Sequence, residues 1–315
     1  MGQRLDLPLP AVPPSAGTPH AARKNAAWIA RHRLLAGEEE LRRHLSFDLP
    51  RLIVSSYPHA EGPDLDLLVD ILSWFTVVDD LFDGPAGRSS AAARALVAPL
   101  TAVLRVDGAS GPSTGGARTV LERAWRDLWH RQAHDMTRTW RARAAREWED
   151  CLGTFVQEAT HREAGTLPTV EEGIRLRRHS SCLYPFMNML ERVTGGELPP
   201  ALVEDPLLQR LRADTADAAT YINDLFSLER EERQAQPFNM VRILQARCGL
   251  RRDEAIAAVR DRVHRSLRDS AESRARLAAA HPAARPYLDG TADLITGVYA
   301  WTSNTRRYHH PAADR

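Results

Sequence analysis

Three aspartates stand close together near residue 80, directly after a long apolar segment. Residues 67–78 are apolar around nearly the whole circumference of a helix, which predicts a helix buried inside a bundle. Asp79, Asp80 and Asp83 follow, and Asp79 and Asp83 fall one turn apart on one face. Their like charges repel, the helix dipole is negative at that end, and burial adds a desolvation cost. Mg²⁺ would remove these costs and share its open positions with substrate phosphates, although a solvated helix end alone explains the motif equally well.

A second polar cluster lies in the segment 218–231. Asn223, Ser227 and Glu231 recur at four-residue spacing, so on a helix they form one stripe with about 6 Å between neighbours. An amide oxygen, a hydroxyl and a carboxylate are a coherent ligand set for a hard cation. Arg230 stands beside them as a permanent cation that suits a phosphate. Hydrogen bonding within a core is the simpler reading of this stripe, but plain packing rarely places three polar groups in line.

Together the two clusters carry a family resemblance. DDLFD at 79–83 and NDLFSLERE at 223–231 resemble the aspartate-rich and NSE metal motifs of bacterial class I terpene cyclases. The segments 57–87 and 239–244 resemble members of the pentalenene synthase type, and the likeness covers nearly the whole chain. The resemblance implies an all-α, single-domain helical bundle around a central active-site cavity. It also implies a lyase that uses three Mg²⁺ ions to ionise a linear isoprenyl diphosphate.

The same resemblance implies a set of residues that hold the diphosphate. By the family's spacing, Arg177 is the diphosphate sensor, Ser180 the linker and Ser181 the effector whose carbonyl helps drive ionisation. Relatives often carry Thr, Asp or Gly at the last two positions. Arg307 and Tyr308 match the C-terminal Arg-Tyr pair that binds diphosphate when the pocket closes. Arg306 is an extra basic residue beside them and an alternative for the arginine role. Without the other motifs, this segment would be read as a frayed basic tail.

The hydrocarbon part of such a substrate needs an apolar wall, because water would quench a carbocation. Phe75 lies one turn before Asp79 and is the best candidate for stabilising a cation by its aromatic face. Leu72, Thr76 and Trp301 are expected to line the same region. Relatives often have a second aromatic residue at the position of Thr76. For Trp74 and Phe82, ordinary core packing is the favoured interpretation.

Two lengths of the isoprenyl diphosphate substrate, C15 and C20, are compatible with the sequence. Farnesyl diphosphate (C15), giving a sesquiterpene, is the expectation for this family. Geranylgeranyl diphosphate (C20) is the alternative, supported by Thr76 and by an aromatic content of only 6%. A prenyl diphosphate synthase would normally carry a second aspartate-rich motif, and a non-catalytic helical scaffold would not need the stripe at Asn223.

Composition excludes several other classes. The 315 residues include 42 basic and 41 acidic ones, so no global field points to nucleic acid or to an anionic membrane. Three scattered cysteines form no disulfide framework. The N-terminus lacks the apolar core of a signal peptide, and no apolar run reaches the ~20 residues of a membrane span. We therefore expect a soluble, cytoplasmic enzyme, with a monomer and a homodimer both open.

The proline-rich residues 1–19 are expected to form an extended arm lying on the body, and residues 20–315 the cyclase domain. Apolar residues in that domain recur at helical spacing and no hairpin signal is present. The predicted helices are 20–45, 64–83, 88–105, 117–131, 136–162, 168–180, 182–194, 204–233, 237–247, 251–279 and 283–305.

Overall fold

The structure is a computed structural model that describes residues 7–10, 12, 17–105 and 119–308. These residues form helices and no strand, which confirms the predicted all-α fold. Two short 3₁₀ turns, Pro85–Arg88 and Pro282–Ala284, join neighbouring helices. The α-helices are α1 Thr18–His32, α2 Glu38–Leu45, α3 Leu49–Ser56, α4 Gly62–Phe82, α5 Ser90–Leu104, α6 Val120–Ala133, α7 Arg138–Ala164, α8 Val170–Ser180, α9 Leu183–Val193, α10 Pro200–Val203, α11 Pro206–Arg233, α12 Met240–Cys248, α13 Arg252–Ala280 and α14 Arg285–Thr302.

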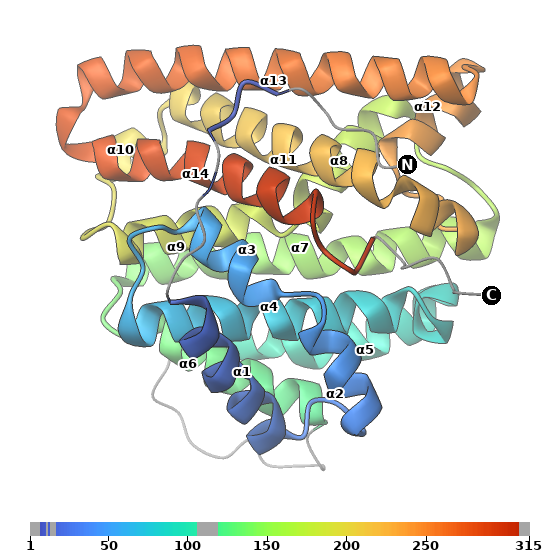
Figure 1. Cartoon of the computed structure of the whole chain (residues 1–315), viewed down its shortest axis with the longest axis horizontal. Coiled ribbons are helices and arrows are strands. Elements are labelled where there is room, and N and C mark those ends of the chain that lie inside the picture. The colour runs from blue at the N-terminus through green and yellow to red at the C-terminus, as the bar shows by residue number, and fades with distance from the viewer. Residues whose placement is uncertain (1–6, 11, 13–16, 106–118, 309–315) are drawn as a thin grey trace.

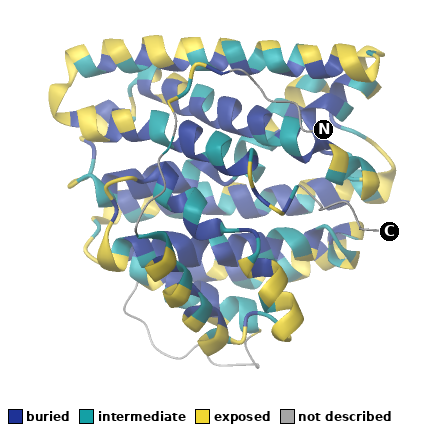
Figure 2. Ribbon diagram, viewed as in Figure 1, coloured by how far each residue is buried: buried dark blue, intermediate teal, exposed yellow. Residues whose placement is uncertain are grey.

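The helices form a bundle in which α4 and α11 run through the interior (Figure 1). α11 packs against α13 and α14, α14 packs against α3, and α4 packs against α1, α3 and α6. Buried residues concentrate in the middle of the bundle, whereas exposed residues line the outer faces of α13, α1 and α2 (Figure 2). None of the helices in the described ranges combines the length and apolar character needed to cross a bilayer.

Three tryptophans, one each from α4, α6 and α7, pack together in the core. The rings of Trp74 and Trp125 stack with centroids 4.4 Å apart, and Trp148 meets Trp125 edge-on at 4.7 Å. Each indole N–H has a partner, as shown by the bond from Trp74 Nε1 to the carbonyl of Leu121 at 3.1 Å. Phe82 stacks on a ring of α7 at 4.4 Å. The assignment of Trp74 and Phe82 to core packing is confirmed.

The first predicted helix, 20–45, is wrong as a single element. The chain leaves α1 at Arg33, whose φ of 54° is left-handed, and α2 begins after Gly37. α3 was missed because eight residues are too few to show a helical period. Tertiary packing stabilises α3 instead, since it lies against α14 where a Cβ at Gly297 would meet Ser56 Oγ at 2.1 Å. The four-residue α10 was missed for the same reason of length.

The N-terminal arm contacts the body at the residues that are described. Leu7 is buried in an apolar cluster formed with α11, α12 and α13. α1 begins at Thr18, so the last two residues of the predicted arm belong to a helix. Most of the remaining arm lies outside the described residues, and the boundary at residue 19 stays a prediction.

Candidate active site

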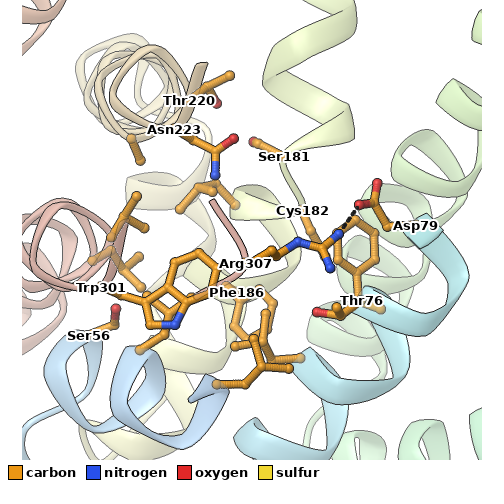
Figure 3. A pocket seen from close by; sticks show the side chains of 18 of the residues that line it. Ser56, Thr76, Asp79, Ser181, Cys182, Phe186, Thr220, Asn223, Trp301 and Arg307 are labelled. Atoms are coloured by element: carbon orange, nitrogen blue, oxygen red, sulfur yellow. Dashed lines mark hydrogen bonds and ion pairs between the residues drawn. The ribbon is translucent and has the colours of Figure 1, made fainter. Parts of the chain in front are cut away.

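A cavity of about 180 Å³ opens between α3, α4, α11, α14 and the junction of α8 with α9. Apolar side chains form one part of its lining and charged or polar side chains the other (Figure 3). Most residues singled out from the sequence lie on this one cavity, namely Leu72, Phe75, Thr76, Asp79, Arg177, Ser180, Ser181, Asn223, Arg230, Glu231, Trp301, Arg307 and Tyr308. Asp80, Asp83 and Ser227 are not part of its lining.

The aspartate cluster occupies the C-terminal end of α4. Oxygens of Asp79, Asp80 and Asp83 all lie within 4.8 Å of one another. Burial, reinforced by the charge of Asp79, raises the pKa of Asp83 to about 7. Burial also opposes ionisation of Asp80, but neighbouring arginines outweigh it and hold the pKa of that carboxyl below its usual range. The cluster is therefore a place where a further positive charge would be stabilised.

Arginines from distant parts of the chain bind this cluster. Arg307 donates to Asp79 Oδ2 at 3.0 Å (Figure 3). It also donates to Asp80 Oδ1 at 2.7 Å, so its guanidinium joins both carboxylates. Arg230 of α11 contacts Asp80 at 3.4 Å and Asp83 at 3.2 Å. The two polar clusters therefore face each other across the bundle, with Arg230 between them.

The stripe on α11 is more enclosed. Asn223 donates through Nδ2 to the hydroxyl of Tyr308 at 2.7 Å. Ser227 is fully buried, and its nearby hydroxyl lowers the pKa of the Glu231 carboxyl. Burial and the charge of Asp224 outweigh this effect, so the net pKa of Glu231 is raised. The three side chains present oxygen atoms along one face, as the spacing predicts.

Two residues that the sequence did not single out hold this stripe in place. Asp224 is fully buried, and its Oδ2 accepts the backbone N–H of Met240 at 2.9 Å. Asn239 donates through Nδ2 to Glu231 Oε2 and to the carbonyl of Asp224, both at 2.8 Å. The start of α12 is thereby tied to α11. For Asn239, the only signal in the sequence was the resemblance of segment 239–244 to the pentalenene synthase type.

At the junction of α8 and α9, Arg177 connects the stripe to the cavity wall. Its guanidinium donates to Asp224 Oδ1 in a short ion pair and to Ser180 Oγ at 3.1 Å. The next residues, Ser181 and Cys182, also line the cavity. Cys182 has a left-handed φ of 62°, which separates the two helices at this point. The structure thus places the predicted sensor and linker in direct contact.

The apolar wall is built from side chains of α3, α4, α9, α11 and α14. Phe75 is 9% exposed and its ring centre lies 6.2 Å from that of Phe155. Trp301 is held by a hydrogen bond from its Nε1 to the carbonyl of Phe47 at 2.7 Å. Phe186 of α9 lies across the cavity from Asn223 and was not predicted (Figure 3). Its segment, 183–190, is apolar except for Asn188, so nothing local distinguishes a wall residue from a core residue.

The donor atoms fit a hard divalent cation. Asp79 on α4 and Asn223 and Glu231 on α11 border the same cavity, and all three offer oxygen. The raised pKa of Asp83 also favours a cation site here, because a nearby dication would stabilise the ionised form of this carboxyl.

A helical bundle with an apolar cavity and two oxygen-rich motifs at its mouth defines the class of metal-using isoprenoid synthases. The model of terpene synthase family 2, C-terminal metal binding, matches residues 70–269. The chain belongs to the terpene synthase family and is an enzyme of the lyase type that acts on prenyl diphosphates.

Individual relatives agree with this placement. Pentalenene synthase from Streptomyces avermitilis is 32% identical over 100% of this chain and 95% of its own length. A (-)-β-caryophyllene synthase from Saccharothrix espanaensis, described as (2E,6E)-farnesyl diphosphate cyclizing, is 30% identical over 83% of this chain and 72% of its own. The crystal structure of linalool/nerolidol synthase from Streptomyces clavuligerus in complex with 2-fluorogeranyl diphosphate has a TM-score of 0.82 at 29% identity. The match covers 91% of this chain and 99% of the chain in that crystal structure.

Proposed function

We propose that this terpene synthase is a Mg²⁺-dependent sesquiterpene cyclase. It ionises farnesyl diphosphate, cyclises the carbocation and releases diphosphate. One observation carries the proposal: Asp79 on α4 and Asn223 and Glu231 on α11 border the mouth of a single cavity whose remaining wall is largely apolar.

The polar mouth holds the metal and the leaving group. Asp79, Asn223, Ser227 and Glu231 would coordinate Mg²⁺, with Asp80 and Asp83 completing the aspartate side and three ions in all. Bound Mg²⁺ supplies the positive charge that stabilises diphosphate as it leaves. Five residues already gathered around this mouth would bind diphosphate oxygens, namely Arg177, Asn223, Arg230, Arg307 and Tyr308. Arg177 would pass that contact on to the junction at Ser181 through its bond to Ser180.

The apolar wall governs the carbocation. Phe75 and Trp301 are nearly buried and line the cavity, so their faces can stabilise positive charge by ~0.5–2 kcal/mol each. Leu72 and Thr76 complete the α4 side of the wall. A largely apolar lining limits the water available to quench the cation.

The choice of a C15 substrate rests on two further points. The relative from Saccharothrix espanaensis is described as cyclising farnesyl diphosphate. The cavity of about 180 Å³ is small for a ligand pocket, which favours the C15 chain over the C20 alternative.

Product analysis tests the proposal. The protein is incubated with geranyl, farnesyl or geranylgeranyl diphosphate, with and without Mg²⁺, and extracts are examined by gas chromatography–mass spectrometry. We expect a cyclic C15 hydrocarbon or alcohol from farnesyl diphosphate only when Mg²⁺ is present. The double variant Asp79→Ala/Asn223→Ala should form none. A cyclic product from the C20 substrate alone would replace the C15 assignment, and no product from any substrate would reject the cyclase.

A further inference from the structure

A second cavity, of about 310 Å³, lies beside the mouth of the first. It shares Arg230 and Arg307 with the active-site cavity and also reaches Asp80. Five of its described lining residues are arginines and one is acidic. The three arginines that are not on the active-site cavity are Arg43, Arg233 and Arg306, and we call them the outer arginine site.

The positive charge of this cavity is not balanced by its own lining. Asp80 is the acidic lining residue, and it already contacts Arg43 at 3.2 Å, Arg230 at 3.4 Å and Arg307 at 2.7 Å. Arg233 and Arg306 are exposed and form no ion pair within the described ranges. Guanidinium groups gathered in this way repel one another, so an anion placed among them would be stabilised.

One wall of the cavity is pre-organised by an aromatic ring. Phe47 is 7% exposed and lies between α2 and α3. The guanidinium carbon of Arg43 is 5.9 Å from the Phe47 ring centre, and that of Arg307 is 5.0 Å from it. Cation–π contacts at these distances orient both side chains before any ligand arrives. The segment after α14 turns toward the side of the bundle on which α2 lies (Figure 1).

We propose that the outer arginine site binds a diphosphate group outside the catalytic cavity. Guanidinium forks match phosphate oxygens in bidentate geometry, and several of them around one cavity suit a group with two phosphates. Arg230 and Arg307 line both cavities. An anion that moves from one cavity to the other therefore stays in contact with positively charged side chains. That the ligand is a diphosphate rests on the proposed function.

Calorimetric titration with inorganic diphosphate in the presence of EDTA tests the binding itself. Without divalent cations, Asp79 and Glu231 repel anions from the active-site cavity, whereas Asp80 is the one acidic residue against five arginines in the described lining of the second cavity. The outer arginine site should therefore dominate. We expect saturable binding that Arg233→Gln/Arg306→Gln weakens about tenfold. The matched control is Arg265→Gln/Arg276→Gln, which removes the same charge from exposed positions on α13. Absence of saturable binding, or equal loss in both double variants, would overturn the proposal.

Steady-state kinetics then separates the two sources of the diphosphate group. Capture of the incoming substrate predicts that Arg233→Gln/Arg306→Gln lowers kcat/KM at unchanged kcat and flattens its dependence on ionic strength. Capture of the released product predicts weaker inhibition by added diphosphate. If neither kinetic parameter changed, the site would have no part in turnover and the proposal would fail. Binding that depends on these arginines in a protein without cyclase activity would reject the proposed function and leave the site intact.

Discussion

The two oxygen-rich motifs at the cavity mouth are neutralised in different ways. The aspartate end of α4 receives its positive charge from side chains of α2, α11 and the segment after α14, among them Arg43, which is 68% exposed. The stripe on α11 is instead held by buried hydrogen bonds from Asn239 and by the Arg177–Asp224 pair. One motif depends on ion pairs with arginines of other elements, and the other on an internal network of hydrogen bonds.

This difference indicates a division of labour between the two motifs. A buried network of hydrogen bonds and ion pairs leaves little freedom to the groups it holds, so the α11 stripe is ready for a cation before substrate arrives. The α4 end must exchange its contacts with Arg307 for contacts with metal, because the guanidinium occupies Asp79 and Asp80. We therefore expect substitutions on the α11 side to affect folding and substitutions on the α4 side to affect cation binding.

Asp224→Ala should have the largest effect. It leaves the guanidinium of Arg177 without its buried partner and removes the acceptor of the Met240 N–H, so we expect a loss of about 3–5 kcal/mol in the free energy of unfolding. Asp80→Ala should cost clearly less, because Arg307 keeps Asp79 as a partner, Arg230 keeps Asp83, and water reaches Arg43. Urea denaturation of both variants without metal measures the difference. Equal losses would contradict the comparison.

Asp83 should make the stability of the metal-free protein depend on pH. Its pKa is about 7 in the folded state against an ordinary value of 3.8, so the folded state binds more protons between these values. The free energy of unfolding therefore falls as pH rises from 4 to 7 because of this group. Asp83→Asn should remove that decrease and raise Tm by several degrees at pH 8. Thermal unfolding with EDTA at pH 5 and pH 8 checks this, and a Tm gain of equal size at both values would disprove it.

Arg307→Gln should strengthen the binding of Mg²⁺ to the substrate-free protein. The substitution removes the guanidinium that competes for Asp79 and Asp80, so we expect the affinity to rise about tenfold while turnover falls. Arg307→Lys keeps the charge and is the matched control, with an affinity near that of the unaltered protein. Calorimetric titration measures both. Unchanged or weaker binding in Arg307→Gln would show that the ion pairs do not compete with metal.

Tyr308→Phe should give the smallest effect. It removes one hydrogen bond, the one from Asn223 Nδ2 to the tyrosine hydroxyl, and keeps the ring packed edge-on against Trp301. We expect a loss of about 1 kcal/mol in kcat/KM and little change in the urea midpoint. A change in the urea midpoint as large as that of Asp224→Ala would place Tyr308 in the folding network instead.

Local patterns allowed much of the bundle to be predicted. The predicted helix 64–83 compares with α4 at Gly62–Phe82, and 204–233 with α11 at Pro206–Arg233. Both are long and strongly patterned, and Pro63 and Pro206 mark their first turns. The break at Arg33 escaped prediction because a left-handed arginine has no sequence signature.

The supporting partners of the site were out of reach for a different reason. Arg177 and Asp224 are 47 positions apart, and Arg307 and Asp79 are 228 apart. Either arginine could pair with many acidic residues in a chain that holds 41 of them. Their partners are chosen by how the helices pack.

The sequence by itself determined the all-α class, the two oxygen-rich motifs and the spacing within each, because residues four apart on a helix must share a face. The tertiary structure decided what surrounds them. It placed Phe186 in the cavity wall, bound Glu231 to Asn239, and gathered Arg43, Arg233 and Arg306 beside the mouth. These contacts join separate elements, and only the packing of those elements brings such groups together.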